Sequence, residues 1–138
     1  MPERVKEDTH YCFGCGERNP IGLKLRFQWE GELLTGVFTP QEEHQGYPGM
    51  THGGIIATLL DEVMANALFS KGIFVVTAEM NVRYIHKVPT GKELRLCSRL
   101  VNHQKRLYEV EGWIEDDAGK VLARGFAKML SISPKKTS

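Results

Sequence analysis

A chain of 138 residues, 41% hydrophobic and 25% charged, fits one globular domain that can bury a core without disulfides or metals. A formal net charge of +1 excludes the overall positive field of a nucleic-acid-binding protein or a basic membrane-surface protein. Three cysteines do not make a disulfide framework, the first residues lack the apolar segment of a signal peptide, and no apolar run reaches membrane-spanning length. These features predict a soluble, cytoplasmic protein without nucleic-acid or membrane partners.

The chain divides into an arm, a domain and a short tail. Residues 1–20 show little periodicity and contain a Cys-Phe-Gly-Cys-Gly turn, so they are predicted to form an N-terminal arm. Regular apolar patterning over residues 21–132 predicts the globular domain. Residues 133–138 read Ser-Pro-Lys-Lys-Thr-Ser, and we expect this tail to be frayed.

The domain pattern predicts two strands, one helix and then four strands. The helix is predicted over 51–70 because apolar residues recur at helical spacing, with Thr51 as its cap and Gly72 just past its end. A polar loop rich in Gly and Pro precedes it over 40–49. Alternating patterns predict the strands over 22–29, 34–39, 75–84, 93–101, 107–114 and 121–132. A long antiparallel sheet with a single helix has exposed edges, which favours dimerisation.

The start of the predicted helix carries the first candidate chemistry. His52-Gly53-Gly54 opens it, and glycine there lets a ligand approach the backbone closely. The first N–H groups of a helix have no intrahelical partner and lie at its positive dipole end. Such groups can stabilise the oxyanion that forms when a carbonyl is attacked. Taken alone, the motif favours an ordinary helix start with a flexible glycine pair.

Asp61 is the second candidate, because a carboxylate in the most apolar segment of the chain is costly unless it is paired or used. It could equally form a hydrogen bond across an interface. Glu62 faces another direction and is expected to be a solvated or salt-bridged surface acid. Eight helical residues place Gly53 and Asp61 about 12 Å apart along the axis. Attack on a carbonyl requires roughly 3–3.5 Å, so the two groups would act together only from different copies of the chain.

An ordered set of motifs extends from Tyr11 to Leu130. Its members are Cys12-Phe-Gly-Cys-Gly, Asn19-Pro-Ile-Gly-Leu, His44-Gln-Gly-Tyr-Pro-Gly, His52-Gly-Gly, Asp61, residues 77–81, Tyr84 and Pro89. This set resembles the hotdog-fold thioesterases of the phenylacetyl-CoA (PaaI-like) type, in the branch that includes the thioesterase superfamily member 4 proteins. The resemblance implies an α+β hotdog fold, order ββαββββ, with a long antiparallel sheet wrapped around one central helix. It also implies hydrolysis of an acyl-CoA thioester to a free acid and coenzyme A.

The resemblance assigns three catalytic roles. Asp61 acts as nucleophile or general base, the Gly53 N–H polarises the thioester carbonyl, and Thr77 positions the attacking water or the carboxylate. His52 and Gly54 are expected to bind substrate at the same turn. Some family members carry an asparagine in the loop before His52-Gly-Gly. The nearest positions here hold Gln45 and Gly46, which departs from that pattern, and Gln45 is the candidate stand-in for substrate binding.

The phosphates of coenzyme A need cationic partners or helix N-termini. Two basic clusters are candidates, and each is also consistent with an ordinary solvated turn. One contains Arg83 with His86 and Lys87, and the other contains Lys105 and Arg106 with His103.

No metal and no cofactor is expected beyond the coenzyme A of the substrate. Cys12-x-x-Cys15 has the spacing of half a zinc site, but no second Cys pair or close His pair follows. His10 alone does not complete four ligands. We therefore expect a tight turn that packs the arm onto the domain, and we expect Cys97 in the core.

Two alternatives to hydrolysis remain. A hotdog-fold enoyl-CoA hydratase would use His52 and Asp61 as an acid–base pair, although the glycines suit carbonyl polarisation better. A non-catalytic acyl-CoA-binding sensor would have no use for a carboxylate beside an anionic ligand. A homodimer is expected as the minimum active unit, with a homotetramer as the larger alternative. The acyl-group preference depends on pocket depth, which Met64, Leu68 and Met80 are expected to set.

Overall fold

The structure is a computed structural model, and it describes residues 11–132. The first ten residues of the predicted arm and the predicted tail over 133–138 lie outside the described part of the chain. The main elements run in the order β1 (Phe27–Glu30), β2 (Leu33–Phe38), α2 (Gly53–Phe69), β3 (Val75–Tyr84), β4 (Leu94–Gln104), β5 (Leu107–Glu115) and β6 (Val121–Ser131). The predicted order ββαββββ is therefore confirmed. A short 3-10 helix, η2 (Glu42–His44), lies within the predicted loop.

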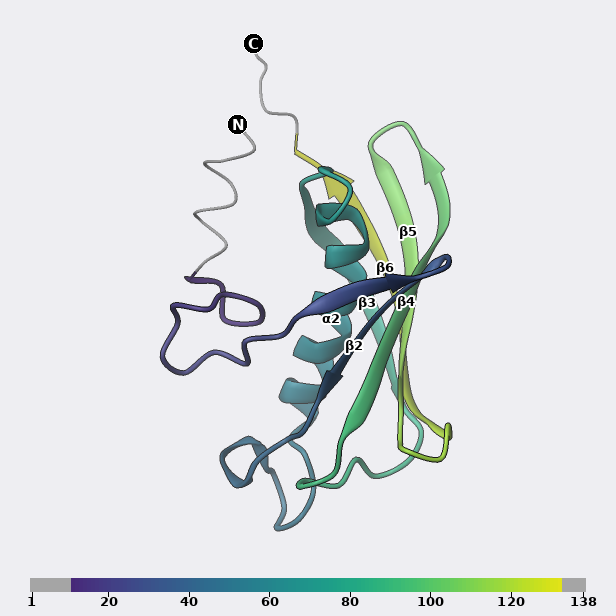
Figure 1. Cartoon of the computed structure of the whole chain (residues 1–138). Coiled ribbons are helices and arrows are strands. Elements are labelled where there is room, and N and C mark those ends of the chain that lie inside the picture. Colours follow the sequence, from purple (N-terminus) through teal and green to yellow (C-terminus); the bar gives the residue numbers. More distant parts are fainter. Residues whose placement is uncertain (1–10, 133–138) are drawn as a thin grey trace.

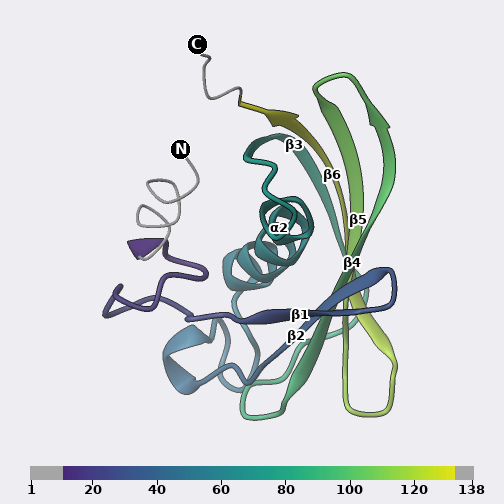
Figure 2. The ribbon, with the colours of Figure 1, turned by 45° about the horizontal axis from the view of Figure 1, so that its top comes forward.

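All six strands form one antiparallel sheet in the order β1-β2-β4-β5-β6-β3 (Figure 1). The sheet curves around one side of α2, while the chain from residue 11 towards β1 crosses the other side (Figure 2). β1 and β3 are the two edges, and β3 pairs only with β6 among the described strands. The predicted long sheet around one central helix is confirmed.

The core lies between α2 and the concave face of the sheet. Apolar residues at helical spacing are buried along one side of α2, namely Ile56, Leu59, Leu60, Val63, Met64, Ala67 and Leu68. Met64 packs so closely on β5 that a Cβ added to Gly112 would lie 2.8 Å from the Met64 Cγ. The Ser98 hydroxyl donates a hydrogen bond to the Val63 carbonyl at 2.6 Å. Met64 and Leu68 thus belong to the core rather than to an open pocket surface.

Several element boundaries differ from the sequence-based expectations, and the strand predicted over 93–101 continues to Gln104 as β4. Helix α2 begins at Gly53 with His52 as its cap, not at residue 51 with Thr51 as the cap. The predicted first strand is reduced to Phe27–Glu30, because Lys24 adopts a φ of 56° and breaks the extended backbone. Leu23 and Leu25 on either side of Lys24 are nevertheless buried, which explains the alternating pattern.

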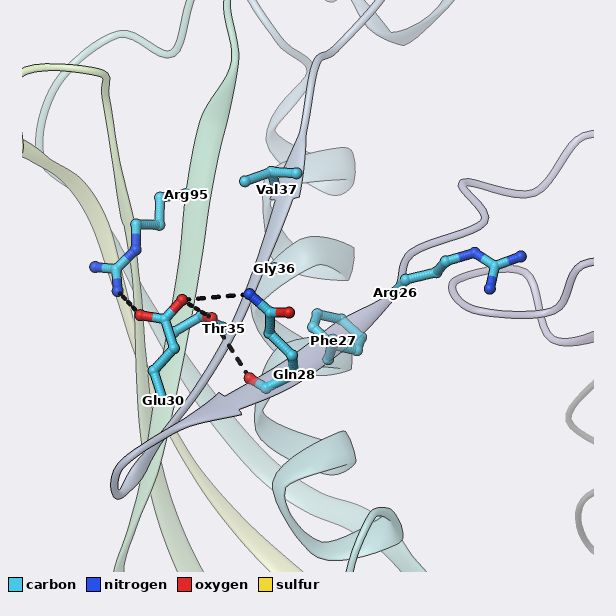
Figure 3. Close-up of a pocket in the computed structure, with 8 residues that line it drawn as sticks. All are labelled: Arg26, Phe27, Gln28, Glu30, Thr35, Gly36, Val37 and Arg95. Carbon is cyan, nitrogen blue, oxygen red and sulfur yellow. Dashed lines mark hydrogen bonds and ion pairs between the residues drawn. The ribbon is translucent and has the colours of Figure 1, made fainter.

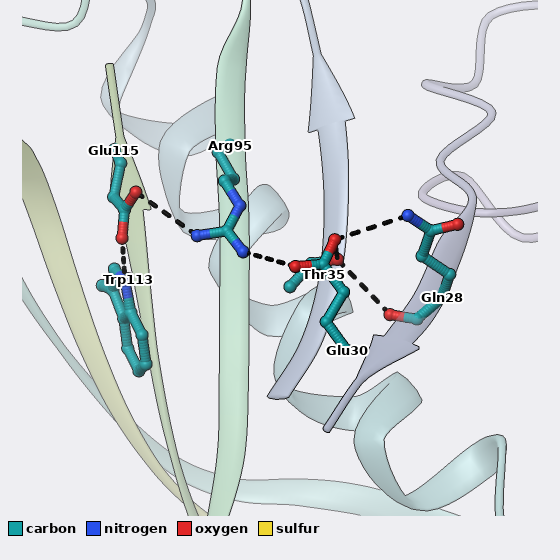
Figure 4. A network of polar contacts seen from close by, with 6 residues as sticks. All are labelled: Gln28, Glu30, Thr35, Arg95, Trp113 and Glu115. Carbon is teal, nitrogen blue, oxygen red and sulfur yellow. Dashed lines mark hydrogen bonds and ion pairs between the residues drawn. The ribbon is translucent and has the colours of Figure 1, made fainter. Parts of the chain in front are cut away.

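The sheet face away from α2 carries a polar network that joins β1, β4 and β5 (Figure 4). Arg95 lies between Glu30, at 2.7 Å, and Glu115, at 3.5 Å. The Thr35 hydroxyl donates to Glu30 at 3.0 Å, and the Trp113 Nε1–H donates to Glu115 at 2.7 Å. These contacts tie the short edge strand to the centre of the sheet. No helix among residues 11–132 is long and apolar enough to cross a membrane.

Candidate active site

The start of α2 presents a free backbone donor at Gly53. The His52 Nδ1 accepts the N–H of Gly54 at 2.8 Å, so the cap occupies the Gly54 donor. The His52 N–H itself donates to the His44 carbonyl at 2.8 Å. Within the described residues, no hydrogen bond uses the N–H of Gly53. Gly53 therefore offers an unpaired donor at the positive end of the helix dipole.

The Asp61 carboxylate is held by a side chain from the sheet. The Thr77 hydroxyl donates a hydrogen bond to the Asp61 Oδ1 at 2.7 Å. Thr77 lies in β3, and a register shift between Thr77 and Glu79 marks a β-bulge at that point. Bulges often redirect side chains beside active sites. Asp61 is only partly buried, so its carboxylate remains accessible on the flank of α2 that faces β3.

The far end of β3 meets the start of the same helix. The Tyr84 hydroxyl donates to the Gly53 carbonyl at 3.1 Å, and the Tyr84 ring lies 3.7 Å from where a Cβ on Gly53 would sit. The sequence pattern gave no reason to expect this contact. Because α2 is uninterrupted from Gly53 to Phe69, helix geometry keeps Gly53 and Asp61 about 12 Å apart. β3 therefore contacts both candidate groups without bringing them together.

Gln45 lies in the loop that leads into α2. Its Oε1 accepts the N–H of Gly49 at 3.1 Å, and its backbone forms an isolated bridge with Thr51. Gly46 packs against His52, with 3.5 Å between a notional Cβ on Gly46 and the His52 Cα. In this conformation the side-chain oxygen of Gln45 stabilises the loop beside the helix cap.

The two basic clusters lie at opposite ends of the sheet within one chain, since Arg83 pairs with the start of β6 and the β4–β5 turn lies beside its end. Arg83 is exposed and precedes Tyr84, which contacts the start of α2. Lys105 and Arg106 lie in the β4–β5 turn. There the Arg106 guanidinium donates to the Ser131 carbonyl at 2.9 and 3.1 Å, so this side chain holds the end of β6. One chain thus places the end of β3 that carries Arg83, and not the β4–β5 turn, at the start of α2.

Glu62 was expected to be a solvated or salt-bridged surface acid, and this expectation is wrong. The arm folds over Glu62, and the Cys12 thiol donates to its Oε2 at 3.6 Å. The Asn66 Nδ2 donates to its Oε1 at 3.4 Å. Burial is the main cause that raises the pKa of the Glu62 carboxyl. The sequence gave no signal for this contact, because fifty residues separate Cys12 from Glu62.

A hollow on the opposite face of the sheet offers no comparable chemistry. It is lined by Arg26, Phe27, Gln28, Glu30, Thr35, Gly36, Val37 and Arg95 (Figure 3). Its ionic groups are already paired, Glu30 with Arg95 inside the hollow and Arg26 with Glu17 outside it. The sheet separates it from Asp61 on α2. We therefore place the candidate active site on the flank of α2 and not in this hollow.

One helix wrapped by a six-stranded antiparallel sheet, with a carboxylate on the helix and a glycine pair at its start, defines a hotdog-fold protein of the thioesterase type. The sequence profile of the thioesterase superfamily matches residues 48–123, and the chain belongs to this superfamily. The family resemblance predicted from the motifs is thereby confirmed.

Individual relatives agree with this assignment. The acyl-coenzyme A thioesterase THEM4 of Rattus norvegicus is 33% identical over 93 residues, which cover 67% of this chain and 40% of the rat protein. The match therefore spans less than half the length of that relative. A thioesterase superfamily protein from Shewanella loihica PV-4 is 29% identical with a TM-score of 0.68, covering 79% of this chain and 91% of the other. The protein smu.793 of Streptococcus mutans UA159, solved bound to acetyl CoA, is 20% identical with a TM-score of 0.74 and covers 81% and 91%.

Proposed function

We propose that this protein hydrolyses an acyl-CoA thioester to a free acid and coenzyme A, at a site shared between two subunits. The observation that carries the proposal is the Asp61 carboxylate, held by Thr77 and accessible on the flank of α2. The substrate class comes from likeness, because relatives are acyl-coenzyme A thioesterases and smu.793 binds acetyl CoA. No cofactor or metal takes part in this reaction scheme.

The geometry supports two routes that start from the same carboxylate. Thr77 donates to Oδ1, so the second carboxylate oxygen is left to react. As a general base, Asp61 would take a proton from water while the water oxygen bonds to the carbonyl carbon. The Gly53 N–H would stabilise the oxyanion. The C–S bond then breaks, and the proton on Asp61 passes to the departing coenzyme A thiolate. As a nucleophile, Asp61 would bond to the carbonyl carbon itself, and the C–S bond would break to release coenzyme A as a thiolate, which takes a proton from solvent. Water would then hydrolyse the resulting anhydride to the free acid and restore the Asp61 carboxylate.

The sharing of the site rests on the edge strand. β3 is ten residues long and its outer edge carries no partner among the described strands. Apolar side chains on and just beyond it are exposed, including Val76, Tyr84 and Ile85. Unpaired edges of this length favour pairing with another chain. Antiparallel pairing of β3 with a second copy would set the two α2 helices side by side, so that Asp61 of one subunit approaches Gly53 of the other. A homodimer is the minimum unit, and two dimers could form a tetramer.

The same arrangement gives both basic clusters a role. Antiparallel pairing would place the β4–β5 turn of one subunit at the end of the sheet where α2 of its partner begins. Lys105 of one chain and Arg83 of the other would then flank the same helix start. Both side chains are exposed and cationic, which suits the phosphates of coenzyme A. Arg106, bound to the Ser131 carbonyl, would support the turn as well as add charge.

The direct test is a hydrolysis screen over short, long and aryl acyl-CoAs with the wild type, Asp61→Asn and a matched control. Asp117→Asn is that control, because Asp117 is an exposed acid in the β5–β6 turn. Loss of a catalytic acid or base typically costs about 10²–10⁴-fold in rate. The hydrolysis rate of Asp61→Asn should therefore fall by at least about 100-fold, while Asp117→Asn keeps wild-type activity.

Other outcomes point to the alternatives. A folded Asp61→Asn variant with near wild-type turnover would refute the proposed role of Asp61. Tight acyl-CoA binding without turnover by the wild type across the panel would favour a sensor. A 3-hydroxyacyl product from an enoyl-CoA would favour a hydratase.

A further inference from the structure

The arm brings two thiols to the carboxylate of Glu62. The Cys12 and Cys15 sulfur atoms and a Glu62 oxygen all lie within 4.8 Å of one another. The Cys12 Sγ lies 3.6 Å from the Glu62 Oε2. Ligand atoms about 2.3 Å from a tetrahedral zinc ion are separated by roughly 3.5–4 Å from each other. The three donors are therefore close to the spacing that one such ion requires.

The backbone holds the two cysteines in place. The Gly16 N–H donates to the Cys12 carbonyl at 2.8 Å, which closes the turn between the thiols. The Leu23 N–H donates to the Phe13 carbonyl at 2.8 Å and the Leu25 N–H donates to the Gly14 carbonyl at 2.9 Å. These bonds anchor the turn to the segment before β1. The arm is so close to α2 that a Cβ on Gly14 would lie 2.2 Å from the Glu62 side chain.

Glu62 is oriented as a metal-binding carboxylate would be. The Asn66 side chain, one helical turn further on, donates to the Glu62 Oε1 at 3.4 Å. The other oxygen, Oε2, faces the thiols. Hydrogen bonds that fix one atom of a ligand while leaving the other free are typical of residues around metal ions. The arrangement therefore leaves one carboxylate oxygen for a cation.

The surroundings of the cluster disfavour negative charge on its acidic groups. All three side chains are partly buried. Burial is the largest cause that raises the pKa of the Cys15 thiol and of the Glu62 carboxyl. The charges that add to these shifts are those of other acidic groups, namely Glu62 and Cys12 for Cys15, and Asp61 for Glu62. Deprotonated thiols in these surroundings would need a compensating positive charge, which a bound cation would supply.

We propose that Cys12, Cys15 and Glu62 form a zinc-binding site that fastens the arm to α2. Two thiolates select a borderline-soft ion such as Zn²⁺ over Mg²⁺ or Ca²⁺, which prefer oxygen ligands. Water or another donor would complete the tetrahedron. Binding displaces the thiol protons to solvent, and no electrons are transferred. The expectation that no metal binds relied on the lack of further ligands in the sequence, and Glu62 supplies the third one through the fold.

The site is separate from the proposed hydrolytic chemistry. Glu62 follows Asp61 directly, but consecutive helix positions point in different directions. Asp61 contacts Thr77 on β3, whereas Glu62 contacts the arm. The ion would thus have a structural role beside the active site, so zinc binding and thioester hydrolysis can each be tested without the other.

Titration of the reduced, chelator-treated full chain with Zn²⁺ and with Co²⁺ tests the site. We expect one ion per chain, and with Co²⁺ an absorption band from thiolate-to-metal charge transfer. Cys12→Ser, Cys15→Ser and Glu62→Gln should each weaken binding by at least about 100-fold, since each removes one of three ligands. Cys97→Ser is the matched control, because Cys97 is buried in β4 away from the cluster, and it should bind like the wild type.

A thiol-alkylation measurement on the same samples provides a second readout. Zn²⁺ should slow the modification of Cys12 and Cys15 in the wild type, and much less in Glu62→Gln. The proposal is overturned if the folded, reduced wild type binds no stoichiometric metal, or if Glu62→Gln binds as tightly as the wild type. Co²⁺ bound without a thiolate band would also overturn it. Recovery of a Cys12–Cys15 disulfide that persists when Zn²⁺ is present would show a redox pair in place of a metal site.

Discussion

The Thr77 hydroxyl donates a 2.7 Å hydrogen bond to the carboxylate of Asp61 and so couples the edge strand β3 to the central helix. The β-bulge beside Thr77 directs this contact. A hydrogen bond to one oxygen fixes the plane of the carboxylate and leaves the other oxygen free. We propose that Thr77 positions Asp61 for catalysis, so its removal should affect the chemical step more than substrate binding.

We predict that Thr77→Val lowers kcat for acyl-CoA hydrolysis by about 10- to 100-fold, the usual worth of a hydrogen bond to a charged group. KM should change little, because the hydroxyl contacts the carboxylate and not the substrate. Thr77→Ser keeps the hydroxyl and should retain most activity. Steady-state kinetics of the three proteins checks this, and equal kcat values for Thr77→Val and the wild type would contradict it.

Arg83→Gln should raise KM for acyl-CoA by about 10-fold and leave kcat nearly unchanged, because a lost phosphate contact weakens substrate binding uniformly. Lys128→Gln is the control, since Lys128 is an exposed cation on β6. Steady-state assays with acyl-CoA and with its 3′-dephospho analogue would show which phosphate is bound. Unchanged KM values with both substrates would show that Arg83 does not bind the phosphates of coenzyme A.

The close packing of α2 on the sheet gives a prediction about stability. A Cβ on Gly112 would lie 2.8 Å from the Met64 Cγ and 3.2 Å from the Cys97 carbonyl. Gly112→Ala should therefore lower the free energy of unfolding by about 1–3 kcal/mol. Gly46→Ala, where the nearest atom would be 3.5 Å away, should cost much less. Urea denaturation at one protein concentration measures both, and equal midpoints would contradict the packing described.

Glu30 provides a prediction about pH. The hydrogen bond from Thr35, and then the one from Arg95, lower the pKa of Glu30 below its ordinary value of 4.5. The unfolded chain thus binds this proton more readily, so the contribution of Glu30 to stability is fully present above pH 4.5 and disappears as the pH falls through its lowered folded pKa. Glu30→Gln should lower Tm slightly at neutral pH and not at strongly acidic pH. Thermal unfolding across pH checks this, with the exposed Glu32→Gln as control, and a pH-independent difference would count against it.

Much of this architecture could be predicted because its signals are local. α2 carries its periodicity in consecutive residues, and the buried alternation of β5 and β6 is equally plain. The separation of Gly53 from Asp61 follows from helix rise alone. The alternation of Leu23 and Leu25 was misleading, since these residues are buried on a segment that Lys24 bends out of the strand.

The contacts that could not be predicted join residues far apart in the chain. Nothing near Cys12 indicates that Glu62 will lie beneath it, because that contact depends on how the arm crosses α2. Likewise, the hydrogen bond of Tyr84 to Gly53 follows from where β3 ends relative to the helix start. Tertiary packing sets both contacts, and no spacing in the sequence encodes either of them.

The central claim is that Asp61 and the Gly53 N–H act together only across two subunits. The Gly53→Pro substitution removes the backbone N–H donor and fits the local backbone of the helix start. Gly53 is the first residue of α2, where proline is well tolerated, and the φ of −61° and ψ of 139° at His52 suit a residue before proline. Gly53→Ala keeps the N–H and meets only ordinary contacts at 3.7 Å, so it is the matched control.

Mixing Asp61→Asn with Gly53→Pro subunits is the most direct measurement. Each homodimer should be nearly inactive, whereas a reassorted heterodimer has one intact site and one doubly damaged site. After circular dichroism shows that both variants are folded, and native mass spectrometry shows that heterodimers form, we predict that activity rises towards half the wild-type value per heterodimer. Heterodimers that form and remain inactive would contradict the shared site.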